Sequence, residues 1–371
     1  MKRLLSIIQV VIWFFSCQPS QEEELPIKYS IETIKIPISS EQLNSYQIQS
    51  NFSLNEKPVL VSYNDKRHSL DFFNLDHEES ITSKNLDSDG PNGIGKIESI
   101  FVQSSDSIFV YELGKLHLLN GDLSKKQSWD LFQIYGDLNL GIPQCNFYFK
   151  LYYDSERQSV YFFMNQMGVS LLEIAELPLM TSLNLETNEV NVLPIYHSEY
   201  FKSVAGQVGF MTYLGFYGKL DNQLIFNYQY ESTIYGFQLN DEKLSTTSSS
   251  KVKFVPSTPQ TNDPQAYDQH AIENPHFLSP IPDPWRNLIY SIVWDSPDAN
   301  SYKTYLDKSQ ILRVFDENLE LIQTVPLPDR TYQINNWFVN ENGLYLNKAH
   351  PGDSLLNEDF LMFDVFKFKV N

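Results

Sequence analysis

The apolar residues of this chain gather in six short runs that are bounded by polar turn residues. Val, Ile, Leu, Phe and Tyr dominate the runs, and these residue types favour β-strands. Because each run is continuously apolar and does not alternate, it predicts a strand whose sheet is covered on both faces. The runs begin 49, 52, 64, 64 and 56 residues apart, and they span residues 58–62, 107–111, 159–163, 223–227, 287–291 and 343–347.

Residues 90–131 show the repeating unit most clearly. A Gly/Pro turn precedes strand-like runs at residues 97–102, 107–112 and 116–119, and an Asn-Gly-Asp turn leads into a fourth run that ends near Trp129. Four short antiparallel strands in about forty residues are the size of one β-propeller blade. The six repeats therefore predict an all-β fold, a β-propeller of six blades with four antiparallel strands in each.

Residues 27–38 lie before the first repeat, and their apolar and polar side chains alternate as in a half-buried strand. The last apolar run, residues 366–370, leaves no spare strand behind it. An unpaired sheet edge promotes aggregation. We therefore expect residues 27–38 to supply the outer strand of the last blade and close the ring, which makes residues 27–371 a single propeller domain.

Two segments depart from the strand pattern. Residues 168–179 have helical spacing that Pro178 interrupts, and we interpret them as an insertion in the third blade, either a helix or two short strands. Residues 255–286 are rich in Pro, Asn and Asp and form the longest stretch without strand character. Loops of that length are either functional or disordered, and the aromatic and His residues of this one favour an ordered loop.

The N-terminus has the pattern of an export signal. Lys2 and Arg3 precede an apolar run of residues 4–15, which is too short to span a bilayer. The run ends at Ser16 and Cys17, and this arrangement resembles a bacterial lipoprotein signal, in which the cysteine is lipidated and becomes the new N-terminus. The resemblance implies that residues 1–16 are removed and that Cys17 carries the lipid. The alternative is an ordinary secretory signal with an incidental cysteine.

Residues 17–26 are polar and acidic, as a solvated tether would be. An acidic cluster directly after the lipidated cysteine resembles the export tag of surface lipoproteins in Bacteroidota, and the alternative is a plain charged spacer. We expect a protein anchored to the outer membrane by its lipid alone, which faces either the periplasm or the cell surface.

The charge of the chain limits its partners. Its formal net charge is −19, and removal of Lys2 and Arg3 with the signal leaves 25 basic and 46 acidic residues, a net charge of −21. Such an acidic surface argues against nucleic acid and anionic headgroups as partners, and it is compatible with neutral glycans, peptides or cations. The partners that we expect are a glycan, a peptide or an envelope protein. If Cys17 is lipidated, Cys145 is the remaining thiol, and its aromatic surroundings predict that it is buried and inert.

The GPNGIGK turn at residues 90–96, the six repeats, the lipoprotein-like start and the segment IPDPWRNLIYSIVW at residues 281–294 resemble a family of six-bladed propeller lipoproteins from Bacteroidota. The family carries a similar Asp-Pro-x-Arg-Asn run before an aromatic strand. This resemblance implies a fold and an envelope location but no activity, because the family has no settled one. The family pattern has an arginine in that strand where this chain has Ser291 and Ile292.

Trp285 and Arg286 are the first candidates for a ligand-binding site. An aromatic face can stack on a sugar or an apolar side chain, and arginine can make paired hydrogen bonds to a carboxylate. The alternative is that Arg286 pairs with Asp283 or with an acidic residue of another blade, while Trp285 packs between blades.

Asp268, His270 and His276 are further ligand-binding candidates in the loop of residues 255–286. They have the residue types and rough spacing of a metal site, but no third strong ligand accompanies them at a suitable spacing. We therefore predict neither a metal nor a cofactor, and the alternative for these residues is local hydrogen bonding within the loop.

The chain carries no Gly-x-Ser-x-Gly elbow, phosphate-binding loop or His-Glu-x-x-His pattern, so we assign no catalytic residue. A binding module for a glycan, a peptide or a partner protein is therefore the favoured function. The alternatives are a hydrolase or lyase that acts at the propeller axis, and a scaffold subunit of an envelope complex. Paired carboxylates at the axis would favour an enzyme, an aromatic surface would favour binding, and a large exposed apolar patch would favour a scaffold.

Overall fold

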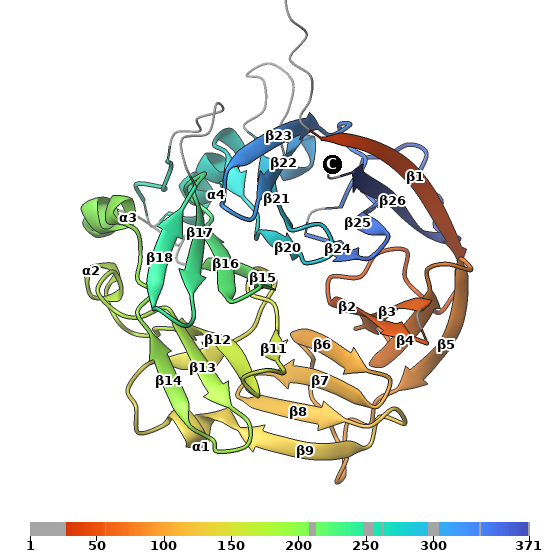
Figure 1. The fold of residues 1–371 in the computed structure, drawn as a ribbon, viewed down its shortest axis with the longest axis horizontal. Helices are drawn as coiled ribbons and strands as arrows, with labels where there is room; N and C mark the ends of the chain where they lie inside the picture. The colour runs from red at the N-terminus through yellow and green to blue at the C-terminus, as the bar shows by residue number, and fades with distance from the viewer. Residues whose placement is uncertain are drawn as a thin grey trace, which may run out of the picture.

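A computed structural model describes residues 27–369, except 56, 208–212, 248–255, 262, 296–303 and 334. The expected signal, the lipidation at Cys17 and the acidic tether lie outside the described residues. The strands form six antiparallel sheets that surround a central axis (Figure 1). This arrangement confirms the predicted six-bladed propeller.

Each blade runs from an inner strand at the axis to an outer strand at the rim (Figure 1). Blade 1 contains β2 (Gln49–Leu54), β3 (Lys57–Asn64), β4 (Ser69–Asn74) and β5 (Glu79–Asn85). Blade 2 contains β6 (Ser99–Ser104), β7 (Ser107–Glu112), β8 (Lys115–Leu119) and β9 (Lys125–Asp130). Blade 3 contains β10 (Ile142–Gln144), β11 (Tyr153–Asp154), β12 (Ser159–Asn165), β13 (Met180–Asn184) and β14 (Val190–Leu193).

The second half of the chain repeats this order. Blade 4 contains β15 (Leu214–Leu220), β16 (Gln223–Tyr228), β17 (Ile234–Gln238) and β18 (Lys243–Thr246). Blade 5 contains β19 (His276–Phe277), β20 (Ile281–Asp283), β21 (Leu288–Trp294), β22 (Gln310–Asp316) and β23 (Leu321–Pro326). Blade 6 contains β24 (Trp337–Asn340), β25 (Gly343–Asn347), β26 (Phe360–Lys369) and β1 (Lys28–Pro37).

The six continuously apolar runs are the second strands of the six blades, namely β3, β7, β12, β16, β21 and β25. Every residue of β16 and β25 is buried. A second strand lies between two strands of its own sheet, and the sheets of the neighbouring blades cover its faces. The pattern therefore follows from the packing, because neither face of such a strand meets water.

The ring is closed by the two ends of the described chain. All ten residues of β1 pair in antiparallel register with β26, from Lys28 opposite Lys369 to Pro37 opposite Phe360. Thr33 Oγ1 also donates to Asp364 Oδ1 across this pair at 2.5 Å. The expected closure by residues 27–38 is confirmed, and β1 covers the edge that β26 would otherwise expose.

The described residues contain four short α-helices between the strands: α1 (Leu131–Tyr135), α2 (Leu171–Ile174), α3 (Glu199–Val204) and α4 (Pro264–Glu273). Two 3₁₀ turns cover Ala205–Gln207 and Tyr305–Asp307. Helix α2 lies in the insertion expected in the third blade. None of the helices in the described ranges is long and apolar enough to cross a membrane.

Helix α4 was not predicted, although its start has clear signals. Asp263 accepts a hydrogen bond from the Gln265 amide at 3.1 Å, and Pro264 occupies the first helical position, where its missing N–H costs nothing. Hydrophobic spacing does not predict this helix, because Ala271 is its one buried residue. Its register is set by capping and not by an apolar stripe.

Candidate binding site on the propeller axis

A pocket of about 220 Å³ lies on the axis, and residues from or beside the inner strands of all six blades line it. We call it the axial pocket. One lining residue from each blade shows its extent: Asn51, Phe101, Tyr152, Tyr217, Pro282 and Trp337. Such a pocket exists because six inner strands converge but do not pair with one another, and side chains fill only part of the space between them.

One end of the pocket is formed by residues 146–151, between β10 and β11, which we call the axial segment. This segment runs beside β15 of blade 4, and Phe149 forms a parallel bridge with Phe216. The Phe216 amide donates to Tyr148 O at 2.9 Å, and the Lys150 amide donates to Phe216 O at 2.8 Å. The backbone of the axial segment is therefore fixed to the neighbouring blade 4.

Side chains from the other blades also hold the axial segment. Asn335 of blade 6 donates from Nδ2 to Phe147 O at 2.7 Å, and Ser279 of blade 5 donates from Oγ to Tyr148 O at 2.6 Å. The Leu151 amide donates to Ser99 Oγ of blade 2 at 2.9 Å, and Lys150 Nζ donates to Gln47 O beside blade 1 at 3.2 Å. The segment thus contacts each of the other five blades.

Beyond the axial segment lies a second cavity of about 410 Å³, which we call the upper cavity. It is lined by residues that precede the inner strands, among them Gln47, Glu98, Asn146 and Tyr148. Burial raises the pKa of Glu98, and the nearby charge of Lys96 opposes this shift. The upper cavity therefore holds a carboxyl group, whereas the described lining of the axial pocket contains no Asp, Glu, His or Cys.

Six of the eighteen described residues that line the axial pocket are aromatic. Tyr152 packs edge-on against Phe101, with ring centroids 5.6 Å apart, and Tyr217 donates its hydroxyl to Asn335 O at 3.2 Å. Trp337 is buried, but Trp285 is 52% exposed. Trp285 thus offers the accessible ring face to a ligand that enters the pocket.

Two lysines line the axial pocket, and their surroundings differ. Lys219 Nζ lies 3.0 Å from Asp154 Oδ1 and 2.7 Å from Glu156 Oε2, so its charge is neutralised. Lys150 Nζ lies over the rings of Phe147 and Tyr217, at 5.4 and 5.6 Å from their centroids. Burial lowers the pKa of Lys150 to about 8. The amine therefore carries most of a positive charge at pH 7, and its half-buried side chain keeps partial contact with water.

The two residues of the Trp285–Arg286 pair have different roles. Arg286 Nη1 lies 2.9 Å from Asp283 Oδ2 and donates to Asn340 O of blade 6 at 3.1 Å. Asp283 is fully buried and also accepts the Tyr290 hydroxyl at 2.8 Å. Arg286 therefore pairs with Asp283, one of the two acidic partners that the alternative named, and it also reaches backbone carbonyl groups of blade 6. Trp285 is exposed and lines the pocket.

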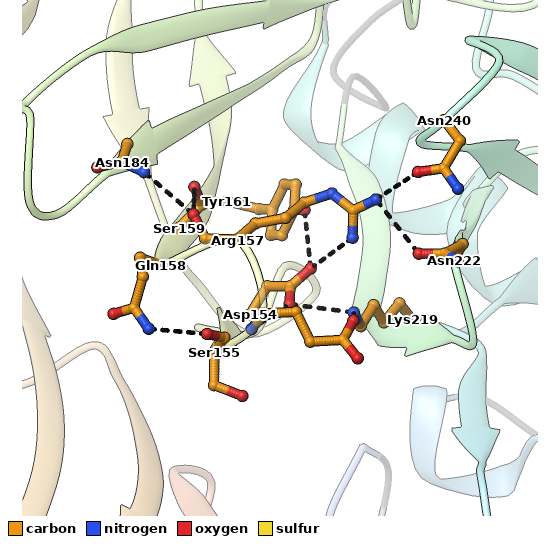
Figure 2. A network of polar contacts seen from close by, with 11 residues as sticks. Asp154, Ser155, Arg157, Gln158, Ser159, Tyr161, Asn184, Lys219, Asn222 and Asn240 are labelled. Atoms are coloured by element: carbon orange, nitrogen blue, oxygen red, sulfur yellow. Dashed lines mark hydrogen bonds and ion pairs between the residues drawn. The ribbon is translucent and has the colours of Figure 1, made fainter.

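The same arrangement recurs in blade 3 (Figure 2). Arg157 lies 3.5 Å from Asp154, which also accepts the Tyr161 hydroxyl at 3.4 Å, and Arg157 reaches blade 4 by donating to Asn240 Oδ1 at 2.7 Å and to Asn222 Oδ1 at 3.2 Å. Both sites have the spacing Asp-x-x-Arg-x-x-x-Tyr. We call this contact of Asp, Arg and Tyr with the next blade the inter-blade latch. It was not predicted, although alignment of residues 154–161 with 283–290 shows the shared spacing.

The remaining candidates lie away from the axial pocket's described lining. Asp268 is exposed on α4, while His270 Nε2 lies 2.8 Å from Ser257 Oγ. His276 is buried in β19 with Nδ1 at 3.5 Å from Lys308 Nζ, and burial lowers its pKa to about 3. Within the described ranges, no group of three His, Cys, Asp or Glu side chains is placed to hold a metal ion.

Two buried side chains complete the account of the sequence candidates. Cys145 is fully buried, and burial raises the pKa of its thiol well above the usual value, in agreement with an inert role. Arg313 of β22 pairs in register with Ser291 and donates from Nη2 to its Oγ at 2.8 Å. A buried guanidinium therefore lies beside the position at which the resembled family has an arginine.

Comparison with known proteins places the chain in a family. Residues 25–323 match the family described as "Domain of unknown function (DUF4221)". A crystal structure of a DUF4221 member from Bacteroides vulgatus is similar, with a TM-score of 0.78, 16% identity, and coverage of 94% of this chain and 99% of that chain. A Bacteroides fragilis structure, described as a "putative exported protein", has a TM-score of 0.57 and 10% identity, and the match covers 92% of this chain and 95% of that one.

These identities are low, so the structural similarities show the fold alone. A search of the curated proteins finds no match to the sequence. The family match spans most of the chain, and the fold agrees with that of a solved member. The chain belongs to the DUF4221 family and is a six-bladed propeller.

Proposed function

We propose that this protein is a binding module of the cell envelope, which holds one end of a glycan or peptide in the axial pocket. The observation that carries the proposal is the pocket itself. It lies where all six blades converge, its walls are aromatic, and it contains a cationic amine. Aromatic walls with a few placed polar groups are the usual composition of a ligand site.

The lining of the pocket favours binding over catalysis. A glycosidase of the common kind needs two carboxyl groups on either side of the scissile bond, and no Asp or Glu is among the described lining residues. The tyrosines are poor general bases, because burial raises the pKa of both Tyr152 and Tyr217. The described lining therefore assembles no pair of carboxyl groups for glycoside hydrolysis, and its buried tyrosines do not replace them as bases.

The size of the pocket restricts what enters it. Its volume of about 220 Å³ is below the range of about 300–1,000 Å³ that encloses most of a drug-sized ligand. It accommodates a single sugar ring or a single amino-acid residue. The rest of a longer ligand would pass over Trp285, whose ring is exposed beside the pocket.

An extracytoplasmic location fits this role. The N-terminal pattern of a lipoprotein signal supports it, and so does the description of the Bacteroides fragilis relative as a "putative exported protein". In the proposed arrangement, lipid on Cys17 anchors the protein to the outer membrane, and the acidic residues 17–26 hold the propeller away from it.

The test is retention of a ligand by the purified protein from pooled oligosaccharides and peptides, with mass spectrometry of the retained and free fractions. We expect an unchanged species to be retained, and its retention to be lost in Trp285→Ala. Phe132→Ala is the matched control, because Phe132 is an exposed ring on α1 at the rim. A new product mass would show an enzyme, and retention of nothing by the folded protein would contradict the proposal.

A further inference from the structure

The amine of Lys150 occupies the middle of the ring. Its backbone is hydrogen-bonded to Phe216 of blade 4, and its Nζ reaches Gln47 O beside blade 1, on the opposite side of a six-bladed ring. Because both ends are fixed, the side chain spans the axis at the point where the axial segment meets the axial pocket. A ligand that enters the pocket along the axis therefore meets this amine.

The positive charge of Lys150 has no anionic partner among the described residues. The chain has 46 Asp and Glu residues against 27 Lys and Arg, and Lys219 in the same pocket lies close to two carboxylates. Lys150 instead has one carbonyl acceptor at 3.2 Å and two aromatic faces. A lysine ammonium has three donors, so acceptors for the other two are to be supplied from outside the described chain. Cation–π contacts compensate only part of the lost hydration.

Two further donors that line the axial pocket are also unsatisfied. Gln49 Nε2 and Trp337 Nε1 have no hydrogen-bond acceptor among the described residues, but both atoms are buried and a ligand in the pocket does not reach them. The charge of Lys150 is different, because the described lining of the pocket contains no Asp or Glu that could pair with it. An unpaired ammonium and no acidic side chain in one small pocket indicate a missing partner that is negatively charged.

We propose that the ligand of the axial pocket carries a carboxylate, which pairs with Lys150. This inference rests on the proposed function and specifies the chemistry of its ligand. A single uncompensated positive charge matches one negative charge, which a carboxylate supplies. Two sources share this group, an acidic sugar and the free C-terminus of a peptide.

The test compares pairs of probes that differ only in this group. One pair is a trisaccharide that ends in galacturonic acid and the same trisaccharide ending in galactose. The other pair is a short peptide with a free C-terminus and the same peptide with an amidated C-terminus. Binding of all four is measured by calorimetry with the wild-type protein, Lys150→Met and Lys202→Met, where Lys202 lies on α3 at the rim.

We expect one acidic probe to bind at least tenfold more tightly than its neutral counterpart, and the pair in which this occurs identifies the source. Lys150→Met should abolish the preference, whereas Lys202→Met should retain it. Equal binding of acidic and neutral probes, or a preference that survives Lys150→Met, would overturn the inference and leave the proposed function intact. If no acidic probe binds, the inference fails, and if the pooled ligands are not retained either, the proposed function fails with it.

A pH series gives a second measurement that needs no variant. Affinity for the acidic probe should fall about tenfold per pH unit above pH 8, as the free amine loses its proton, until the pKa of the bound amine is reached. The other groups near the amine are Tyr148, Tyr152 and Tyr217, whose pKa values burial raises, together with Glu98, Lys96 and the paired Lys219. An affinity that does not change between pH 7 and pH 10 would contradict the pairing with Lys150.

Discussion

The turns at residues 154–157 in blade 3 and 283–286 in blade 5 share one design. In each turn a buried Asp accepts the backbone amide two residues later, an Arg three residues later and a Tyr hydroxyl seven residues later. In each, the Arg reaches the next blade. The turns differ at the second position, which is Ser155 in blade 3 and Pro284 in blade 5, and at the third, which is Glu156 in blade 3 and Trp285 in blade 5.

This difference separates architecture from function. The repeated Asp, Arg and Tyr join neighbouring blades, so Arg286 needs no ligand to explain it. Glu156 also has a structural partner, because it pairs with Lys219. Trp285 has an exposed ring and lies at the axial pocket. Of the residues that differ between the two turns, Trp285 is therefore the one that offers an aromatic ring to a ligand.

The largest expected effect comes from removal of the buried carboxylate in either turn. We predict that Asp283→Asn lowers the free energy of unfolding by about 3–5 kcal/mol, because Arg286 then loses its buried counterion. Asp154→Asn should cost a similar amount, since it leaves both Arg157 and Lys219 without their shared partner. Urea unfolding followed by tryptophan fluorescence measures both.

Asp316, in a turn of blade 5, provides a control for these two variants. Asp316→Asn changes a partly exposed Asp that accepts only local hydrogen bonds in the turn before β23, so it should cost less than about 1 kcal/mol. If Asp283→Asn or Asp154→Asn were no worse than Asp316→Asn, the latch would not contribute to stability.

A smaller effect is expected from the two arginines, and it should differ between the turns. Arg286 is the less exposed side chain, at 13% against 30% for Arg157, and it donates to backbone carbonyls of blade 6. Arg157 donates to the side-chain amides of Asn222 and Asn240, which water can satisfy after its removal. We predict costs of about 2–3 kcal/mol for Arg286→Met and about 1 kcal/mol for Arg157→Met.

The measurement is the same urea titration, with Arg67→Met as the control, because Arg67 forms an exposed ion pair with Glu41. Equal costs for Arg286→Met and Arg157→Met would mean that the carbonyl contacts of Arg286 add nothing to the shared salt bridge.

The blade architecture could be predicted from sequence because each strand has a local pattern of apolar and polar residues that follows from its burial. A second strand such as β16 is covered on both faces, and this makes its run continuously apolar. The alternation in residues 27–38 similarly predicted the closing strand. The inter-blade latch was also present in the sequence, but it becomes visible only when two blades are compared with each other.

The axial site could not be predicted in this way. Residues 146–151 are aromatic and strand-like, yet they cross the axis because groups from five other blades hydrogen-bond to them. Nothing local distinguishes Lys150 from Lys219, and the difference between them is the presence of Asp154 and Glu156 beside only one. The site therefore depends on the complete ring.

Removal of Lys150 and removal of Lys219 should change the free energy of unfolding in opposite directions. We predict that Lys150→Met raises the free energy of unfolding at pH 7 by about 1 kcal/mol, because it removes a desolvated charge without a counterion. Lys219→Met should lower it, because Asp154 and Glu156 lose their counterion. Urea unfolding at pH 7 compares the two.

The pH dependence checks the cause. The folded pKa of Lys150, about 8, lies below its ordinary value of 10.5, so between these values the unfolded chain binds more protons. Stability should therefore rise with pH across this window in the wild type relative to Lys150→Met. A difference between the two proteins that stays constant from pH 7 to pH 10 would show that the charge of Lys150 is not the source of the effect.

The smallest effect on stability, and the largest on binding, is expected at Trp285, the third residue of the turn in blade 5. Trp285→Ala should change the free energy of unfolding by less than about 1 kcal/mol, because its ring is mostly exposed and its backbone amide still bonds to Asp283. The same variant should abolish ligand retention. Glu156→Gln, at the matching position of blade 3, should keep retention, because the propeller and the ring of Trp285 are unchanged. Loss of stability in Trp285→Ala as large as in Asp283→Asn would instead make Trp285 part of the latch.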